Sequence, residues 1–319
     1  MGPGSGYGGR RIGWSGTGMS SMRVSAEGLV LGVALDALLG DPKKWHPVAG
    51  FGRVASVAER YLYADARWRG VVHTGLLVGG AGALGIGIER VARGRVAHGL
   101  ATAGVTWAVL GGTSLGREGL AMARFLERGD LEAARERLPH LCARDPRGLD
   151  AEGVTRAVVE SVAENTSDAS IAPLFWGAVA GVPGLLMYRA VNTLDAMVGY
   201  RSPRYERFGW AAARLDDAVN WVPARVTGGL VALCSGRGAW RMLLRDGGKH
   251  PSPNAGRCEA AFAGALGVRL GGVNEYAGRV ERRPEMGDGR APEVRDIRGA
   301  VRLSAAVTVA AAAVIWSLR

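Results

Sequence analysis

Three acidic residues stand four positions apart in one short stretch of the chain. Glu160, Glu164 and Asp168 fall on one face of a helix, because residues i and i+4 lie one above the other. Like charges at this spacing destabilise a helix unless a cation, a proton or a basic side chain neutralises them. The segment that follows, residues 171–191, is strongly apolar, and carboxylates at the edge of an apolar region are costly to leave unpaired. This acidic stripe is therefore a candidate functional site.

Two smaller groups of polar residues suit metal or phosphate chemistry. Asn192 and Asp195 lie three positions apart and share a helix face that could hold a metal–phosphate complex. If they act with the acidic stripe, the apolar segment between them must bring both onto one side. Asp41 and His46 stand in a turn after an apolar segment, where a cap for the following helix is the plainer interpretation.

A pair of adjacent acids, Asp216 and Asp217, is followed by Asn220 within about one helical turn. Adjacent carboxylates need Mg²⁺ or a basic partner close by. Arg214 and Arg225 flank the group, and simple salt bridges to them are an equally good explanation. Both interpretations stay open at this level.

The segment 247–256 is rich in glycine and in hydrogen-bond donors. Lys249, His250, Ser252 and Asn254 stand close together in it. Such a loop suits an anion or a phosphate group, because several donors converge on a flexible backbone. It is not a Walker A loop, since the order Gly-x4-Gly-Lys-[Ser/Thr] is absent.

Composition narrows the class of protein. The chain has 319 residues, a formal net charge of +11 and 48% hydrophobic residues. No basic run with interleaved aromatics resembles a nucleic-acid surface, so nucleic acid is not an expected partner. Cys142, Cys234 and Cys258 fit no metal-ligand spacing and are interpreted as small core or loop residues in a reducing compartment. Residues 1–21 are polar and glycine-rich, and we expect a disordered tail there before a single domain over residues 22–319.

Long apolar segments decide the fold class. Residues 71–88 and 96–115 approach the length that crosses a bilayer, and an arginine-containing link joins them as a helical hairpin. The loops that flank the hairpin carry more Lys and Arg than the link, which places those loops in the cytoplasm. We expect a mostly α, polytopic integral protein of the cell membrane with about four to five spans and cytoplasmic helical loops. The alternative is a soluble all-helical protein with alanine-rich core helices. Further apolar candidates are residues 24–39, 171–191, 222–235 and 303–318.

Taken in order, these polar segments resemble the CobD/CbiB family, the adenosylcobinamide-phosphate synthases of cobalamin biosynthesis. The resemblance extends from about residue 24 to about residue 272. Two positions depart from the family pattern: Arg189 stands where lysine is common, and Arg257-Cys258 replaces a more usual Trp-Pro pair. The matching words are LLGDP (38–42) with HP (46–47), VESVAENTSD (159–168) with APLF (172–175), NTLDAMVGY (192–200), FGWA (208–211), RLDD (214–217), NWVPAR (220–225) and HPSPNAG (250–256).

The resemblance implies an ATP-dependent amide ligase in the membrane. Its substrates would be adenosylcobyric acid and (R)-1-amino-2-propanol or its O-phosphate, and its product adenosylcobinamide or the phosphate of it. ATP as co-substrate and Mg²⁺ are the expected cofactors, because a carboxylate must be activated before an amine can attack it. Membrane lipid and other cobalamin-assembly enzymes are further expected partners, and the active site is expected to face the cytoplasm.

The resemblance also gives provisional roles to the polar residues. The expected catalytic residues are Glu164, Asp168 and His46. The expected metal ligands are Glu160, Glu164, Asp168, Asp195, Asp216 and Asp217. The expected substrate- and phosphate-binding residues are Asp41, Asn165, Arg189, Asn192, Arg214, Asn220, Arg225, Lys249, His250, Ser252 and Asn254.

Two other classes of protein remain as alternatives. A membrane prenyltransferase also places Asp and Asn clusters on helices to bind Mg²⁺-diphosphate, but its usual pair of Asp-x-x-x-Asp words is not evident here. A non-catalytic membrane component of the same pathway would need none of this chemistry.

Overall fold

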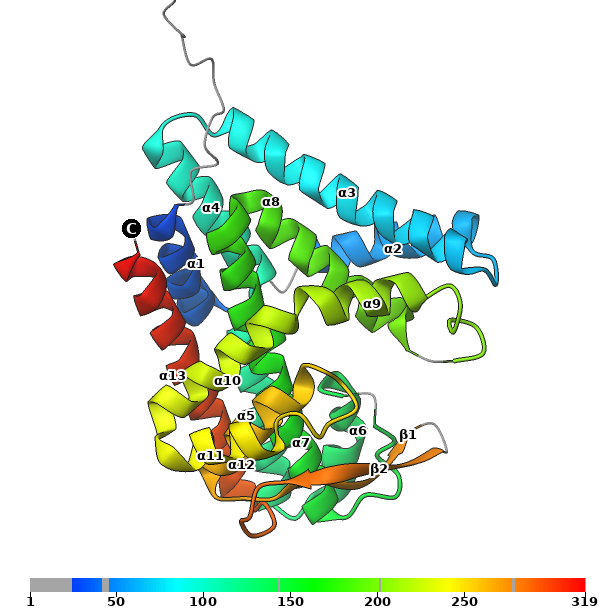
Figure 1. The fold of residues 1–319 in the computed structure, drawn as a ribbon, viewed down its shortest axis with the longest axis vertical. Coiled ribbons are helices and arrows are strands. Elements are labelled where there is room, and N and C mark those ends of the chain that lie inside the picture. Colours follow the sequence, from blue (N-terminus) through cyan, green and yellow to red (C-terminus); the bar gives the residue numbers. More distant parts are fainter. Residues whose placement is uncertain (1–24, 42–45, 143, 201, 277–278, 319) are drawn as a thin grey trace, which may run out of the picture.

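The chain is mostly α-helical, with one short β-hairpin near its C-terminal end (Figure 1). The computed structural model describes residues 25–41, 46–142, 144–200, 202–276 and 279–318, with the backbone alone described between 273 and 282. The predicted disordered tail, residues 1–21, lies outside the described residues. The elements are α1 (Ala26–Leu39), α2 (Pro47–Leu62), α3 (Arg67–Val91), α4 (Arg95–Val109), α5 (Gly112–Glu127), α6 (Leu131–Arg137), α7 (Ala151–Thr166), α8 (Ala172–Leu194), α9 (Trp210–Val219), α10 (Trp221–Ser235), α11 (Arg237–Asp246), α12 (Ala255–Leu266), β1 (Leu270–Tyr276), β2 (Arg279–Met286) and α13 (Val294–Ser317).

Three of the described helical stretches are long and apolar enough to cross a membrane. They are α3, the continuous stretch Ala151–Gly199 that contains α7 and α8, and α13. On α3, Leu76 and Leu84 are exposed, as expected for side chains that face lipid. The fold is therefore that of a mostly α-helical membrane protein.

Other predicted spans form shorter helices. Helix α1 has 14 residues, and α4 and α10 have 15 each. At 1.5 Å per residue these helices are about 21–23 Å long, which is less than the ~30 Å thickness of a hydrocarbon core. The predicted span 96–115 is divided between α4 and α5 by a break at Leu110 and Gly111.

Helix α8 bends sharply in its middle. Gly181 has a φ of +62°, a conformation that favours glycine, and Pro183 follows it. The backbone N–H of Val182, which the bend frees, donates a hydrogen bond to Glu89 Oε1 of α3 at 2.9 Å. A side chain on Gly184 would clash with the Trp176 carbonyl oxygen, since a Cβ there would lie 2.2 Å away. The second half of α8 thus packs back against the first.

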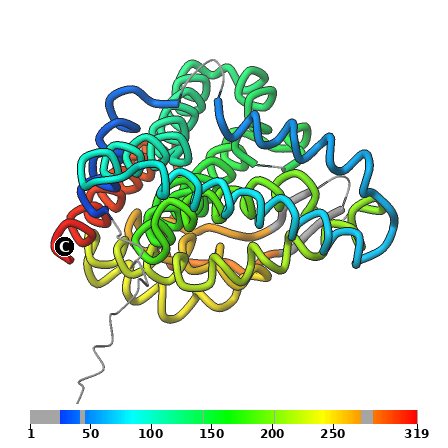
Figure 2. The backbone as a smooth tube through the Cα atoms, turned by 90° about the horizontal axis from the view of Figure 1, so that it is seen from above, coloured from blue at the N-terminus to red at the C-terminus, as the bar shows by residue number. Residues whose placement is uncertain are grey.

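The two ends of the described chain close the helical bundle. Helices α1 and α13 lie side by side, as the views in Figures 1 and 2 show. Both helices contribute to the main apolar core, which includes Leu29 of α1, Val307 of α13 and Val162 of α7. At the other end of the molecule the antiparallel strands β1 and β2 pair next to α7, α11 and α12. The hairpin therefore lies against the end of the bundle formed by α7, α11 and α12.

Candidate active site

A small polar cavity lies where α7, α9, α10 and the beginning of α12 meet. Its volume is about 40 Å³, which gives room for roughly three water-sized particles. A corrinoid or a nucleotide is much larger, so either would have to bind at the opening of this cavity. The predicted site residues that line it are Glu164, Asp168, Asp216, Asp217, Asn220, Ser252 and Asn254; Ser167, Ala224, Ala255 and Cys258 complete the wall.

A π-helical turn shapes the first wall of the cavity. Helix α7 passes into α8 through the turn Ser167–Ile171, and such turns are frequent at functional sites. Glu164 precedes the turn and is exposed, whereas Asp168 lies inside it and is half-buried. Ser167, which the sequence analysis missed, lines the cavity between them. Two members of the predicted acidic stripe therefore contribute to one site.

The fold-back of α8 brings its C-terminal residues to Asp168. Asn192 Nδ2 donates to Asp168 Oδ2 at 3.4 Å, and Arg189 Nη1 donates to Asn192 Oδ1 at 2.9 Å. The Arg189 guanidinium also reaches two backbone carbonyls, those of Asp168 and Val109. The structure thus has the expected proximity between the acidic stripe and Asn192. These contacts orient the Asp168 carboxylate from behind the cavity.

Asp195 lies near the acids of the cavity without lining it. It begins a second π-helical turn, Asp195–Gly199, at the end of α8. Burial, together with the negative charges of Asp168 and Asp195, raises the pKa of Asp216 well above its ordinary value of 3.8. Asp195 therefore acts on the site through its charge.

The end of α9 supplies the second acidic wall. Asn220 Nδ2 donates to Asp216 Oδ2 at 3.0 Å, and the Tyr188 hydroxyl donates to Asn220 Oδ1 at 2.9 Å. Among the described residues, the buried Oδ1 of Asp216 has no hydrogen-bond partner. Arg214 Nη1 lies 3.7 Å from Asp217 Oδ2. The salt-bridge interpretation of this pair therefore holds for Asp217 but not for Asp216.

The loop after α11 forms the rim of the cavity. Ser252 Oγ accepts hydrogen bonds from the backbone N–H groups of Asn254 and Ala255, at 3.3 and 3.2 Å. Asn254 Nδ2 donates to the backbone carbonyl of Asp217 at 2.8 Å, which joins this loop to α9. His250 turns away from the cavity: its Nδ1 accepts from the Ser252 N–H at 3.0 Å, and its Nε2 lies 3.9 Å from Glu259 Oε1.

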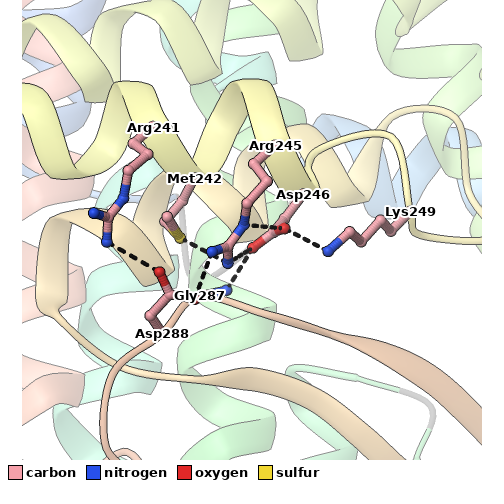
Figure 3. Close-up of polar contacts among 7 residues, drawn as sticks. All are labelled: Arg241, Met242, Arg245, Asp246, Lys249, Gly287 and Asp288. Carbon is pink, nitrogen blue, oxygen red and sulfur yellow. Dashed lines mark hydrogen bonds and ion pairs between the residues drawn. The ribbon is translucent and has the colours of Figure 1, made fainter.

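Lys249 also points away from the cavity, into a separate charged cluster (Figure 3). Its Nζ lies 2.7 Å from Oδ1 of the fully buried Asp246. Arg245 Nη2 donates to the same carboxylate at 2.6 Å, and the Gly287 backbone N–H donates to it at 2.9 Å. Asp246 therefore fixes the start of the loop to the end of β2. We correct the assignment of Lys249 to phosphate binding, because its charge is already paired.

Glu160 is a second correction to the predicted site. Although it belongs to the acidic stripe in sequence, its carboxylate does not line the cavity. Oε2 accepts from Arg144 Nη2 at 2.5 Å, and Oε1 accepts from the Gly271 backbone N–H at 2.7 Å. A carboxylate held by a buried arginine and an amide has its charge balanced, so we remove Glu160 from the proposed metal ligands.

Three further predicted residues lie elsewhere. His46 caps the beginning of α2, where its Nδ1 accepts from the Val48 N–H at 3.2 Å, and it lies 3.7 Å from Asp41. The capping interpretation of this turn describes its geometry, and neither residue lines the cavity. Asn165 Nδ2 donates to the backbone carbonyl of Ser161 at 2.9 Å, within α7.

Cys258 was interpreted as an ordinary small residue, yet it forms part of the cavity wall. It is buried and stands four positions after Asn254, on the same face of α12. This i, i+4 spacing was the signal that could have placed it at the site.

The charge of the cavity suits a hydrated cation. Its lining contains Glu164, Asp168, Asp216 and Asp217 and, within the described chain, no positively charged side chain. Among the described residues, no group of three or more His, Cys, Asp and Glu side chains is placed so that it could hold a metal ion by itself. Mg²⁺ commonly keeps several waters and binds through one or two carboxylates and the phosphates of a substrate. Oδ1 of Asp216 has no hydrogen-bond partner among the described residues, and the carboxylates of Asp168 and Asp195 repel its charge. A Mg²⁺ ion would satisfy this oxygen and reduce the repulsion.

The fold and the cavity together define an α-helical membrane protein with an acidic site between its helices. A family profile described as CobD/Cbib protein matches residues 29–304. No solved structure matches the chain.

Curated relatives extend this similarity over nearly the whole chain. The chain is 56% identical to "Cobalamin biosynthesis protein CobD" of Mycobacterium tuberculosis (strain CDC 1551 / Oshkosh), an alignment that covers 92% of this chain and 95% of the relative. It is 46% identical to the protein of the same name from Geobacter metallireducens, over 85% of this chain and 89% of the relative. For the Rhodobacter capsulatus protein the identity is 40%, with coverage of 91% and 98%. The chain therefore belongs to the CobD/CbiB family of cobalamin biosynthesis proteins.

Proposed function

We propose that the protein is an ATP- and Mg²⁺-dependent amide ligase. It joins a carboxylate of adenosylcobyric acid to the amine of (R)-1-amino-2-propanol or of its O-phosphate, and the product is adenosylcobinamide or its phosphate. The observation that carries this proposal is the buried Oδ1 of Asp216, which has no hydrogen-bond partner among the described residues and lies among like charges in a cavity whose described lining holds no positively charged side chain. Such a site favours a divalent cation bound to phosphate over a free organic substrate.

In this proposal ATP supplies the phosphoryl group that turns a carboxylate oxygen of the substrate into a leaving group. Asp168 and Asp216 are the residues that would hold the Mg²⁺ accompanying the phosphates. Asn192 and Asn220 orient these two carboxylates through the hydrogen bonds that they donate. A Mg²⁺ ion bound through so few carboxylates would neutralise the charge of the phosphate groups while they react.

Glu164 is the proposed general base. It is exposed beside Asp168 and can accept the proton that the ammonium group must lose before it attacks. The neutral amine then forms the amide C–N bond, the C–O bond to the phosphate breaks, and phosphate leaves. Ser252 and Asn254, on the rim, are placed to orient the entering substrate.

The location of the site follows from its co-substrate. ATP is a cytoplasmic metabolite, so the proposed active site faces the cytoplasm, and the apolar helices anchor the protein in the cell membrane. Membrane lipid and neighbouring cobalamin-assembly enzymes are the expected partners. An amphiphilic corrinoid could then pass between enzymes along one membrane face.

The test is product formation by the purified full-length protein in detergent. Adenosylcobyric acid, ATP and Mg²⁺ are supplied with either free or phosphorylated aminopropanol, and the product is identified by mass spectrometry. We expect amide product that disappears without ATP or after chelation of Mg²⁺. A matched control is Arg237→Gln, a change at an exposed position of α11. If the wild-type protein forms no amide with either amine, a non-catalytic component or an enzyme of prenyltransferase type becomes the better explanation.

A further inference from the structure

Two arginines beside the cavity have no acidic side chain paired with them among the described residues. Arg225 lies on α10, and Arg257 is the third residue of α12. Arg225 stacks on the Trp221 ring at 4.0 Å from its centroid, and its Nη1 donates to the Trp221 carbonyl at 2.7 Å. The same nitrogen lies 3.5 Å from Oδ1 of Asn254, a residue of the cavity rim.

Arg257 lies against the glycine pair that begins the rim loop. A Cβ on Gly247 would stand 3.1 Å from Arg257 Cδ, and one on Gly248 would stand 3.5 Å from Nη2. The two glycines therefore leave the space that this side chain occupies. Its Nε is buried and has no hydrogen-bond partner within the described chain. The guanidinium thus keeps donor capacity that the protein does not use.

The two guanidinium groups also repel each other. Burial, followed by the positive charge of Arg257, lowers the pKa of Arg225 below its ordinary value. Most other cations of this region are neutralised: Arg245 and Lys249 by Asp246, and Arg214 by Asp217. Two adjacent cations without a counter-charge form a site for an anion.

We propose that Arg225 and Arg257 bind a phosphoryl group at the mouth of the acidic cavity. The planar guanidinium suits two phosphate oxygens at once, and the beginning of α12 adds the positive end of a helix dipole. Asn254 contacts the Arg225 guanidinium and the backbone carbonyl of Asp217, and it thereby connects this phosphoryl site to the wall of the cavity. A phosphate held here would present its remaining oxygens to a cation between Asp168 and Asp216.

The proposal rests on the proposed function, because it names how that site would take its phosphorylated ligand. Two ligands share the required group, namely the phosphate monoester of the aminoalcohol and the phosphates of ATP.

The experiment measures equilibrium binding to the full-length protein in a detergent that contains no phospholipid. The ligands are aminopropanol O-phosphate, free aminopropanol and ATP, and the proteins are wild type, R225Q, R257Q, R257K and the control R237Q. We expect R225Q and R257Q to weaken binding of one phosphorylated ligand by about ten- to a hundredfold, the effect of losing a hydrogen bond to a charged group. R257K should lose less, and R237Q nothing. Binding of free aminopropanol should not change.

The ligand that loses affinity identifies the source of the phosphate. The inference is overturned if R225Q and R257Q bind both phosphorylated ligands as tightly as wild type does, if free aminopropanol loses affinity equally, or if wild type binds neither phosphorylated ligand. Should R257Q fail to fold, R225Q decides, because the half-buried Arg225 side chain packs on the exposed ring of Trp221 and is paired with no acid among the described residues. Binding needs no turnover, so a protein that binds phosphate but forms no amide contradicts only the proposed function.

Discussion

Two aspartates of this protein stand near the C-terminal ends of α9 and α11 and have opposite surroundings. Asp246, near the end of α11, receives Arg245, Lys249 and the Gly287 N–H (Figure 3). These donors, Arg245 first, hold its pKa far below the ordinary 3.8. Asp216 on α9 has a raised pKa, because burial and other carboxylates oppose its charge. The protein neutralises the charge of Asp246 with its own groups, whereas the charge of Asp216 is left for a ligand to neutralise.

The largest effect that this comparison predicts is on turnover by Asp216→Asn. Asparagine keeps the shape and the contact with Asn220 but removes the charge that the cation needs. We expect turnover to fall by about 10²–10³-fold, the range seen when one electrostatic group of a site is removed. Thermal stability should stay the same or rise, because the repulsion from Asp168 is relieved. Product formation and an unfolding curve in detergent measure both, and unchanged turnover would show that Asp216 has no catalytic role.

Asp246→Ala should lower the stability of the protein and leave its turnover largely intact, the reverse of Asp216→Asn. It leaves the Gly287 N–H without its acceptor and removes the charge-assisted hydrogen bonds of Arg245 and Lys249. We expect a loss of about 2–3 kcal/mol of stability. Well below the lowered melting temperature, turnover should remain measurable. If turnover is lost in a protein that melts like wild type, the structural role assigned to Asp246 is wrong.

The two aspartates should also give stability opposite slopes with pH. The folded state holds a proton on Asp216 from pH 3.8 up to its raised pKa, so this contribution is full below pH 3.8 and is lost as the pH rises through that window. Asp246 contributes stability above pH 3.8 that is lost as the pH falls toward its lowered pKa. Each slope is at most about 1.4 kcal/mol per pH unit.

Melting temperatures of wild type, Asp216→Asn and Asp246→Asn over this pH range measure the two slopes. The first variant should lose the decline with rising pH, and the second the decline with falling pH. Parallel curves for all three proteins would contradict the assigned pKa directions.

The local part of this site could be predicted from the sequence. Positions three or four apart on a helix are neighbours whatever the tertiary fold, which is why Glu164 with Asp168, and Asp216 with Asn220, were identified together. The apolar segments predicted the helices for the same local reason.

The partners of these residues could not be predicted, because they come from distant parts of the chain. Glu160 looks like its neighbour Glu164 in sequence, yet Arg144 and the Gly271 N–H balance its charge. The fold-back of α8 depends on Glu89, which lies on another helix and accepts from a freed N–H group. Helix periodicity says which side chains share a face, but not which charge the rest of the chain supplies to that face.

Lys249→Ala should have the smallest effect. It tests whether the cluster around Asp246 is independent of the proposed phosphoryl site. Its ion pair with Asp246 is half-exposed at the lysine end, and pairs of this kind contribute about 0–1 kcal/mol. Arg245 and the Gly287 N–H would still hold the carboxylate, so the loop should keep its place. We expect turnover and the affinity for phosphorylated ligands to change less than about twofold, whereas R257Q lowers that affinity at least about tenfold. A loss in Lys249→Ala as large as that in R257Q would mean that the lysine leaves Asp246 when phosphate binds, and the phosphate site would then extend from Arg257 into the cluster of Asp246.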